Sequence, residues 1–286
     1  MHSNLRTLGL FAALTLLFVG IGYLLGGLYA DEWVLGALFF LALATIMNIV
    51  SYFLSDKIVL WSYRAKIVTE AEAPRVYNIV KKICLKGDLP MPRVAIVPTH
   101  NPNAFATGRN RKNAVVAVTE GILTLLSDDE LEGVLAHEMA HVKNKDMLVM
   151  SVAATIAGAI SFAARVFIFT RARNNAHPAI VIVAIVTAPL AALLLQLAIS
   201  RNREYKADRE GALMIQRPRS LARALAKLEE GNRRRPIERG NPATSTLFIV
   251  NPFRGGGIVT LFMTHPPMGA RIRRLEELAE QTGYLG

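Results

Sequence analysis

The residue pattern with the clearest chemical meaning is His137-Glu138-Met139-Ala140-His141. Histidines at positions i and i+4 of an α-helix lie on one face, about 5–6 Å apart at Cβ, so both imidazoles can bind one metal ion. The glutamate beside them is placed to act as a base for a water molecule on that ion. Roughly 0.006 chance matches are expected at the His and Glu frequencies of this chain, which disfavours two unrelated surface histidines.

A catalytic zinc site takes a third protein ligand and keeps its fourth position open. Glu204 is the candidate, because it follows the apolar stretch 147–200 by four residues while His141 precedes that stretch by six. If the stretch enters the membrane and returns, both residues lie roughly 6–9 Å from the same membrane surface. We therefore predict that His137, His141 and Glu204 bind one Zn²⁺ per chain. A solvated Glu204 paired with a neighbouring basic residue is the alternative.

Two aspartates are candidates to hold the histidines in place. Asp208 lies one helical turn after Glu204, and carboxylates commonly fix the tautomer of a ligating histidine. Asp146 could orient a ligating histidine in the same way. An equal alternative is that Asp146 only ends a helix at the level of the lipid headgroups. Three ligands with Glu138 as general base predict hydrolysis of a peptide bond by a metal-activated water, without a covalent intermediate.

The composition excludes a soluble globular protein, a disordered chain and a small disulfide scaffold. Apolar residues make up 52% of the 286 residues, the mean hydropathy is +0.32, and there is one cysteine. Uncharged, mainly apolar stretches occupy residues 7–30, 33–55, 147–164 and 174–200. About 20 residues cross the hydrocarbon layer of a membrane, and a signal peptide has a shorter apolar core of about 7–15 residues. The sequence therefore predicts a mainly α-helical integral membrane protein with a small β-sheet.

Four parts follow from this pattern. They are a membrane hairpin of two transmembrane helices (1–56), a catalytic part with the two histidines (57–146), a second apolar hairpin (147–200) and a catalytic part with the third ligand (201–286). Four complete spans place Arg165, Arg171 and Arg173 outside the cell, whereas a shallow or re-entrant second hairpin does not. The sequence leaves both arrangements open.

The basic residues indicate which side the catalytic parts face. Lys and Arg collect on the cytoplasmic side of membrane proteins, and here residues 56–146 carry 13 of them and residues 201–286 carry 16. Both catalytic parts are therefore predicted to face the cytoplasm. The net charge of +11 predicts contact with anionic lipid headgroups. Nucleic-acid binding by Arg233-Arg234-Arg235 is disfavoured because no aromatic residues interleave with these arginines.

Local patterns predict the elements around the site. Apolar residues at helical spacing predict a helix over residues 73–86, and β-branched runs predict strands at 93–98 and 113–119. Ser127 and Glu130 form a capping-box pattern, so a helix should begin there and carry the two histidines. No proline follows before Pro178, and the helix can therefore continue into the third apolar stretch.

Four sequence blocks resemble those of the HtpX membrane zinc metallopeptidases, relatives of the eukaryotic prenyl-protein endopeptidase. They are 103–108 (Asn-Ala-Phe-Ala-Thr-Gly), 137–141, 204–208 (Glu-Tyr-Lys-Ala-Asp), and 264–267 (Thr-His-Pro-Pro) followed by 271–275 (Arg-Ile-Arg-Arg-Leu). With the two amino-terminal spans, the resemblance covers nearly the whole chain. It implies a zincin-like α+β catalytic domain built around a four-segment membrane part, zinc ligands at His137, His141 and Glu204, and Glu138 as the catalytic glutamate.

The same resemblance implies further roles at the site. The substrate-binding edge, to which an extended peptide can add, is made of Asn103, Ala104, Phe105 and Ala106. A plain loop with Phe105 in the core is the alternative. His265 is implied to approach the site and donate to the oxyanion, with a helix-capping histidine as the alternative, and Arg271 to hold a carboxylate such as Asp208.

The resemblance also implies a biological setting. It places the protein in the inner (plasma) membrane of a prokaryote as a multi-pass protease. Its substrates are then membrane and unfolded proteins, cleaved in the quality control of damaged or misassembled membrane proteins.

Two other classes of protein fit the sequence less well than an endopeptidase. An ion transporter is disfavoured because His137, His141 and Glu204 lie outside the uncharged stretches, whereas transport sites lie near the middle of the membrane. An inactive peptide-binding scaffold is disfavoured because it has no need for the base Glu138.

Overall fold

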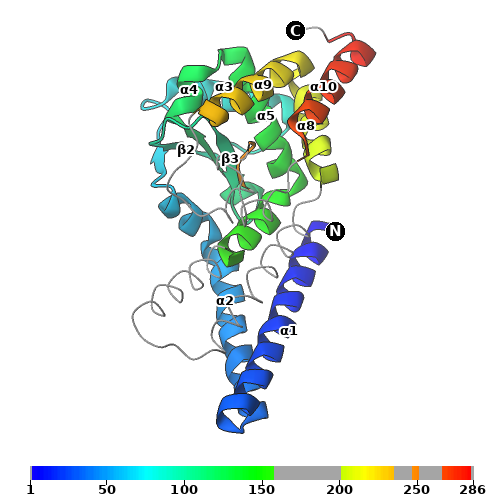
Figure 1. Ribbon diagram of the computed structural model, residues 1–286. Helices are drawn as coiled ribbons and strands as arrows, with labels where there is room; N and C mark the ends of the chain where they lie inside the picture. Colours follow the sequence, from blue (N-terminus) through cyan, green and yellow to red (C-terminus); the bar gives the residue numbers. More distant parts are fainter. Residues whose placement is uncertain (1, 158–200, 235–246, 251–265, 285–286) are drawn as a thin grey trace.

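The computed structural model describes residues 2–157, 201–234, 247–250 and 266–284. Two long helices form a hairpin that projects from an α/β part (Figure 1). The described helices are α1 (His2–Ala30), α2 (Trp33–Ser62), α3 (Pro74–Gly87), the 3-10 turn η1 (Arg111–Asn113), α4 (Glu120–Leu125), α5 (Asp128–Asn144), the apolar helix Asp146–Ala157, α8 (Arg201–Ile215), α9 (Pro218–Arg234) and α10 (Met268–Thr282). The strands are β1 (Lys66–Val68), β2 (Arg93–Val97), β3 (Ala104–Thr107) and β4 (Val115–Thr119).

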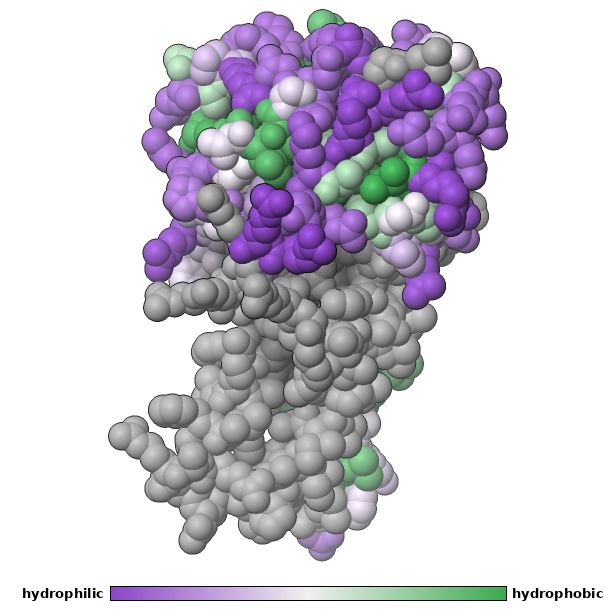
Figure 2. All heavy atoms as spheres, turned by 45° about the horizontal axis from the view of Figure 1, so that its top comes forward, coloured by the Kyte–Doolittle hydropathy of each residue, from purple (hydrophilic) through white to green (hydrophobic). Residues whose placement is uncertain are grey.

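Helices α1 and α2 have the length and composition of membrane spans. Their apolar stretches are Leu8–Gly27, of 20 residues, and Trp33–Ser62, of 30 residues. Only 17% and 11% of their most apolar windows are buried, so these are not core helices, and their exposed apolar surface matches a lipid environment. By contrast, hydrophilic side chains dominate the face of the α/β part shown in Figure 2. The prediction of two apolar helices long enough to span a membrane in this part of the chain is confirmed.

Close helix packing holds the hairpin together. A Cβ atom on Gly36 would lie 2.2 Å from the Gly22 carbonyl oxygen and 2.7 Å from the Gly26 Cα, so only glycine allows this approach. Asn48 of α2 donates to the Thr15 hydroxyl of α1 at 3.0 Å, which adds a polar contact between the two helices. The turn of the hairpin lies away from the α/β part, so α1 begins and α2 ends on the same side (Figure 1).

The sheet has four strands in the order β1-β2-β4-β3. Strand β2 pairs in parallel with β4, while β1 and β3 pair antiparallel with β2 and β4 respectively. Strands β2 and β4 are the two β-branched runs expected from the sequence. Because every residue of β4 is buried, its Val-Val-Ala-Val run packs on both faces, as expected for an inner strand.

Each face of the sheet packs against a different layer. On one face, Val94, Val116 and Val118 join a core with α3, α5, α8 and α9. On the other face, Val97 and Phe105 join a second core with the end of α2 and the helix Asp146–Ala157. The second core thus ties the sheet to the membrane hairpin.

The helix that carries the two histidines begins as predicted and ends earlier than expected. Ser127 caps it, and the Glu130 side chain completes the capping box. It does not run on uninterrupted into the third apolar stretch, because α5 ends at Asn144 and Lys145 takes a left-handed conformation with φ of 60°. The next helix starts at Asp146. This break turns the chain so that Asp146 faces back toward His141.

Candidate metal centre and active site

Helices α5 and α8 pack antiparallel and bring the site together. His141 of α5 lies beside Glu204 of α8, whereas His137, one turn earlier, lies beside Asp208, one turn later. Further along, a Cβ atom on Gly211 would lie 2.8 Å from the Ala136 carbonyl and from the His137 backbone nitrogen. Glu204, Asp208 and Gly211 are spaced i, i+4 and i+7 and therefore lie on one face of α8. This face offers two carboxylates to the histidines, and the missing side chain of Gly211 lets the backbone of α5 approach closely.

We expect the substitution Gly211→Ala to push α8 away from α5. The clash is with the backbone of α5, which cannot rotate aside, and overpacking of this kind costs about 1–3 kcal/mol of unfolding free energy. Zinc affinity should fall at least tenfold, as measured by competition with a chelator. Gly269→Ala in α10, where nothing lies within 4 Å of the added methyl group, is the matched control. Unchanged zinc affinity in Gly211→Ala would show that this close approach is dispensable.

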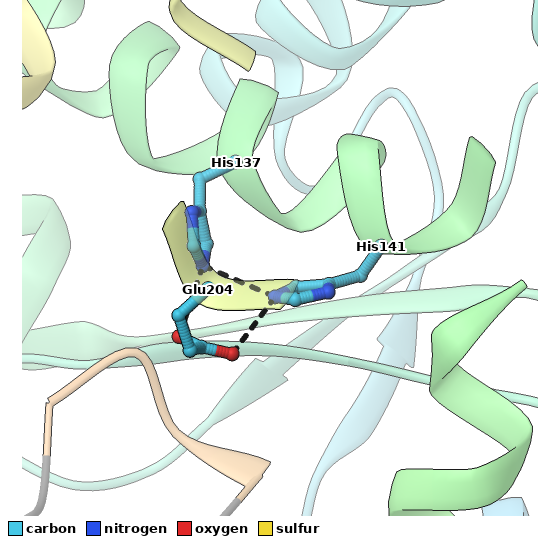
Figure 3. A group of neighbouring side chains, drawn as sticks. All are labelled: His137, His141 and Glu204. Atoms are coloured by element: carbon cyan, nitrogen blue, oxygen red, sulfur yellow. Dashed lines mark hydrogen bonds and ion pairs between the residues drawn. The ribbon is translucent and has the colours of Figure 1, made fainter. Parts of the chain in front are cut away.

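Three side chains converge as a metal-binding set (Figure 3). One ligand atom from each of His137, His141 and Glu204 lies within 4.8 Å of the others, and all three residues are buried. The two Nε2 atoms are 3.2 Å apart, and Glu204 oxygens lie 3.5 Å from His141 Nε2 and 3.8 Å from His137 Nε2. Tetrahedral zinc ligands at about 2.0–2.1 Å from the ion are about 3.3 Å from one another, so the set fits zinc. The predicted ligand set is confirmed as one cluster.

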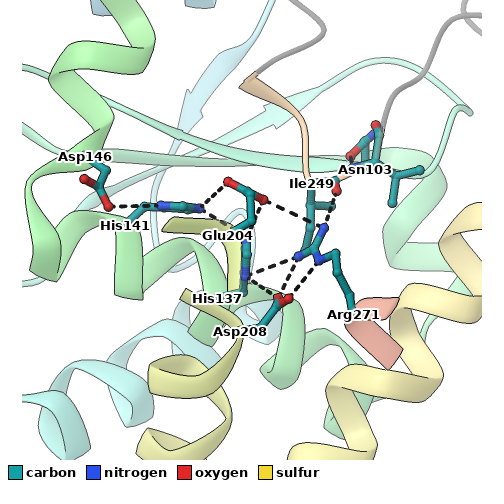
Figure 4. A network of polar contacts seen from close by, with 9 residues as sticks. Asn103, His137, His141, Asp146, Glu204, Asp208, Ile249 and Arg271 are labelled. Atoms are coloured by element: carbon teal, nitrogen blue, oxygen red, sulfur yellow. Dashed lines mark hydrogen bonds and ion pairs between the residues drawn. The ribbon is translucent and has the colours of Figure 1, made fainter. Parts of the chain in front are cut away.

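Asp208 contacts His137 on the side of the imidazole away from the metal position, and Arg271 in turn contacts Asp208 (Figure 4). His137 Nδ1 is 2.9 Å from Asp208 Oδ1, which leaves Nε2 to face the metal position. Arg271, from the first turn of α10, donates to both Asp208 oxygens at 2.8 and 2.7 Å and lies 3.8 Å from Glu204 Oε2. The structure thus places Asp208 and Arg271 at the site, in contact with each other.

His141 has a similar but looser arrangement. Its Nδ1 lies 3.6 Å from Asp146 Oδ2, and Asp146 Oδ1 lies 3.5 Å from Arg203 Nη1. Asp146 is therefore buried beside His141, at the first residue of the helix Asp146–Ala157. Arg203 was not singled out from the sequence, although its position directly before Glu204 places it on the same helix turn.

The charges around the histidines favour a cation. Burial lowers the pKa of His137 to about 4, against the opposing effect of Asp208, so its imidazole is neutral and can offer a lone pair. Burial also lowers the pKa of His141, but the carboxylates of Asp146 and Glu204 outweigh it and raise this pKa to about 9. His141 thus lies where the surrounding charge is negative, which suits a divalent ion.

Glu138 interacts both with the charges of the metal-binding set and with the backbone of Ala106 in β3. It is buried, and burial raises its pKa to about 7. The backbone amide of Ala106 and the charge of His141 act in the opposite direction. A carboxyl group with this pKa changes protonation near neutral pH, which a proton-transfer group requires.

Residues Asn103–Ala106 form the edge of the sheet beside this site, but a segment of the same chain already contacts this edge. The Ala104 carbonyl accepts a hydrogen bond from the Ile249 N–H at 3.2 Å, and the Asn103 side chain forms hydrogen bonds with the main chain of Val250. Phe105 is buried in the second core, as the loop interpretation anticipated, although it lies on a strand. His265 and residues 158–200 lie outside the described residues.

Comparisons with known proteins identify the family of this chain. The family model of "Peptidase family M48" matches residues 70–279. A "Protease HtpX homolog" of Pyrococcus furiosus is 51% identical over 287 residues, which cover 98% of this chain and 97% of the relative. A protein of the same name from Syntrophotalea carbinolica is 49% identical over 284 residues, covering 96% and 99%. A solved structure, Ste24p of S. mikatae, is similar with a TM-score of 0.49 and 15% identity, over 96% of this chain and 66% of that one.

The matched span contains the whole metal-binding set and Glu138, and the relatives align along nearly their full length. The chain therefore belongs to peptidase family M48, as a zinc metallopeptidase with a His–His–Glu metal site.

Proposed function

We propose that this metallopeptidase hydrolyses peptide bonds of membrane proteins close to the cytoplasmic membrane surface, with Glu138 as general base. The observation that carries the proposal is the position of strand β3. Its Ala106 amide faces Glu138, and the chain then continues to Arg109, whose guanidinium lies 5.8 Å from the ring of Phe53 in α2. The candidate substrate edge thus runs from the catalytic base to the end of a membrane helix.

Each residue of the site has a distinct task in this proposal. Zinc, when bound, supplies Lewis acidity to a water molecule and to the scissile carbonyl. Glu138 accepts a proton from the water and returns it to the leaving amine. Asp208 and Arg271 hold His137 in the ligating tautomer, and Asp146 orients His141. Main-chain pairing with β3 gives affinity with little demand on sequence, which suits substrates recognised by their lack of structure.

The base predicts a rising pH profile. Catalysis requires ionised Glu138, whose pKa burial raises to about 7, and a bound divalent cation favours the ionised form. We therefore expect kcat/KM to rise as pH increases from 5, with a midpoint at or below pH 7. The measurement is peptide cleavage from pH 5 to 9, with zinc content checked at each pH. A rate that stays constant down to pH 5 while zinc is retained would contradict this role.

The proposed topology follows the charge pattern. The division into a membrane hairpin (1–56), catalytic parts (57–146 and 201–286) and a second apolar hairpin (147–200) remains a proposal. Arg109, Lys112, Lys143 and Lys145 are exposed near the junction of α2 with the helix Asp146–Ala157, where they can contact anionic lipid headgroups on the cytoplasmic side of a prokaryotic plasma membrane. Quality control of damaged membrane proteins is the biological role that this placement suits.

A substrate series in proteoliposomes tests the proposal. One unstructured peptide sequence is placed at increasing distances from a transmembrane helix, and the same sequence is also offered as a soluble peptide. We expect the membrane-linked forms to be cleaved at least tenfold more efficiently, with an optimum near the membrane. Equal cleavage of all forms would overturn the membrane-protein preference and leave the peptidase activity standing.

A further inference from the structure

We propose that the segment Leu247–Val250, here called the strap, is a built-in pseudosubstrate that occupies the substrate edge and must leave it before a substrate can pair there. This inference rests on the proposed function, since it assumes that substrates add to β3. In this arrangement the enzyme is autoinhibited until the strap is displaced from β3.

The strap occupies an outward main-chain group of β3 that an added strand would use. The Asn103 carbonyl accepts from Thr119 of β4, so the next carbonyl along the strand, that of Ala104, points away from β4. This outward carbonyl accepts from the Ile249 N–H at 3.2 Å. Strand addition to a sheet edge depends on such outward groups.

The Asn103 side chain extends this pairing by one residue. Its Nδ2 donates to the Val250 carbonyl at 2.7 Å, and its Oδ1 accepts from the Val250 N–H at 3.4 Å. A side-chain amide that pairs with both main-chain groups of one residue recognises the backbone and not the side chain. Such a contact can hold the strap or any extended peptide in its place.

The strap also reaches the metal-binding set. Arg271 Nη1 donates to the Ile249 carbonyl at 3.0 Å and lies 3.8 Å from Glu204 Oε2 (Figure 4). One arginine nitrogen therefore contacts both a zinc ligand and a strap carbonyl. A single side chain, that of Arg271, therefore links the strap to the metal-binding set.

An aromatic contact anchors the strap to the rest of the molecule. The Phe248 ring packs edge-on against Tyr63 at 4.9 Å and against Phe105 at 5.3 Å between centroids. Tyr63 directly follows α2, and Phe105 belongs to β3. The anchor therefore joins the strap to the end of the membrane hairpin and to the substrate edge, so a change in either one can alter how firmly the strap is held.

Hydrogen exchange on the Glu138→Gln protein tests the proposal directly. A saturating peptide substrate is added to zinc-loaded protein, and exchange is followed at the Ile249 and Val250 amides. We expect both amides to be protected in the free protein and to exchange at least tenfold faster with the peptide bound. Protection that persists or increases would overturn the proposal, because the strap would then be a fixed wall of the site.

The variant Phe248→Ala gives an independent kinetic test. Loss of the anchor should weaken the strap and raise kcat/KM for a short peptide at least tenfold at unchanged zinc content, mainly through a lower KM. Phe39→Ala, an exposed phenylalanine on α2, is the matched control. Unchanged or lower kcat/KM in a zinc-loaded, folded Phe248→Ala protein would contradict the strap proposal.

The two proposals fail in different ways. If the wild-type protein binds zinc but cleaves no peptide, the proposed function fails and the strap proposal fails with it. If the wild-type protein cleaves peptides while the strap stays in place, only the strap proposal fails.

Discussion

Replacing Glu138 by glutamine is expected to reduce peptide cleavage by about 10²–10⁴-fold, the range that a lost general base costs, while zinc stays bound. Glutamine keeps the size of the side chain and can still accept from the Ala106 amide, but it cannot take a proton from water. His137, His141 and Glu204 remain, so the metal content should stay near one zinc per chain. Casein cleavage and elemental analysis of the detergent-purified proteins measure both quantities.

The same substitution should stabilise the metal-free protein at alkaline pH. Burial raises the pKa of Glu138 from 4.5 to about 7, so the folded state disfavours the ionised carboxyl. The cost of ionisation grows as pH rises through this interval and is complete above pH 7, where it amounts to about 3 kcal/mol. After chelation, Glu138→Gln should therefore melt at a higher temperature than wild type at pH 8, and the two should converge below pH 4.5.

Glu132→Gln is the matched control for both effects. Glu132 is a buried glutamate on the same helix, but it pairs with Lys82 and Lys86 away from the metal site. This variant should keep its activity. A Glu138→Gln protein as active as wild type would falsify the proposed mechanism, and one that loses its zinc would show that Glu138 contributes to metal binding.

The parts of the site that could be predicted from sequence are those that local periodicity determines. The i, i+4 spacing of the histidines, the capping box at Ser127 and the β-branched runs of β2 and β4 act within a few residues, and each forms as expected. Glu204 was predictable for a different reason. An apolar stretch long enough to enter a membrane and return is expected to bring its two flanking helices together, and the structure does place Glu204 beside His141.

Features that depend on distant contacts escaped prediction. Lys145 adopts a left-handed conformation although it is neither a glycine nor an asparagine. Strap residue Ile249 reaches β3 across 145 positions of sequence, and no local pattern encodes that pairing. Gly211 could have been noticed, because a glycine in a helix interior at i+7 from a ligand suggests a close approach to another backbone.

Arg271 is expected to be the residue outside the ligand set whose loss most reduces the free energy of unfolding and the zinc affinity. Its side chain is fully buried and lies between Asp208, Glu204 and the strap, so its charge is balanced by the carboxylates around it. Burial would raise the pKa of Asp208, but Arg271 outweighs this and lowers it to about 2. The stabilisation from this pair is therefore present above pH 4 and is lost only as pH falls toward 2.

The substitution Arg271→Met removes the charge and leaves Asp208 buried without its partner. Breaking a buried pair in this way costs about 3–5 kcal/mol, and loss of support behind a ligating histidine lowers metal affinity about 10–100-fold. Thermal melting and chelator competition at pH 7.5 measure the two effects. Arg219→Met, which removes a partly exposed pair with Glu276 on α10, is the matched control and should cost at most about 1 kcal/mol.

A double variant separates the lost pair from the lost packing. If the cost of Arg271→Met comes from an uncompensated carboxylate, then adding Asp208→Asn should restore part of the stability, because the buried charge disappears with its partner. Zinc affinity should not recover to the same extent, since asparagine orients His137 less strongly than a carboxylate does. A double variant less stable than Arg271→Met would mean that Arg271 acts mainly through its contacts with Glu204 and the Ile249 carbonyl. Its principal role would then be to position the strap and the third ligand, and not to compensate Asp208.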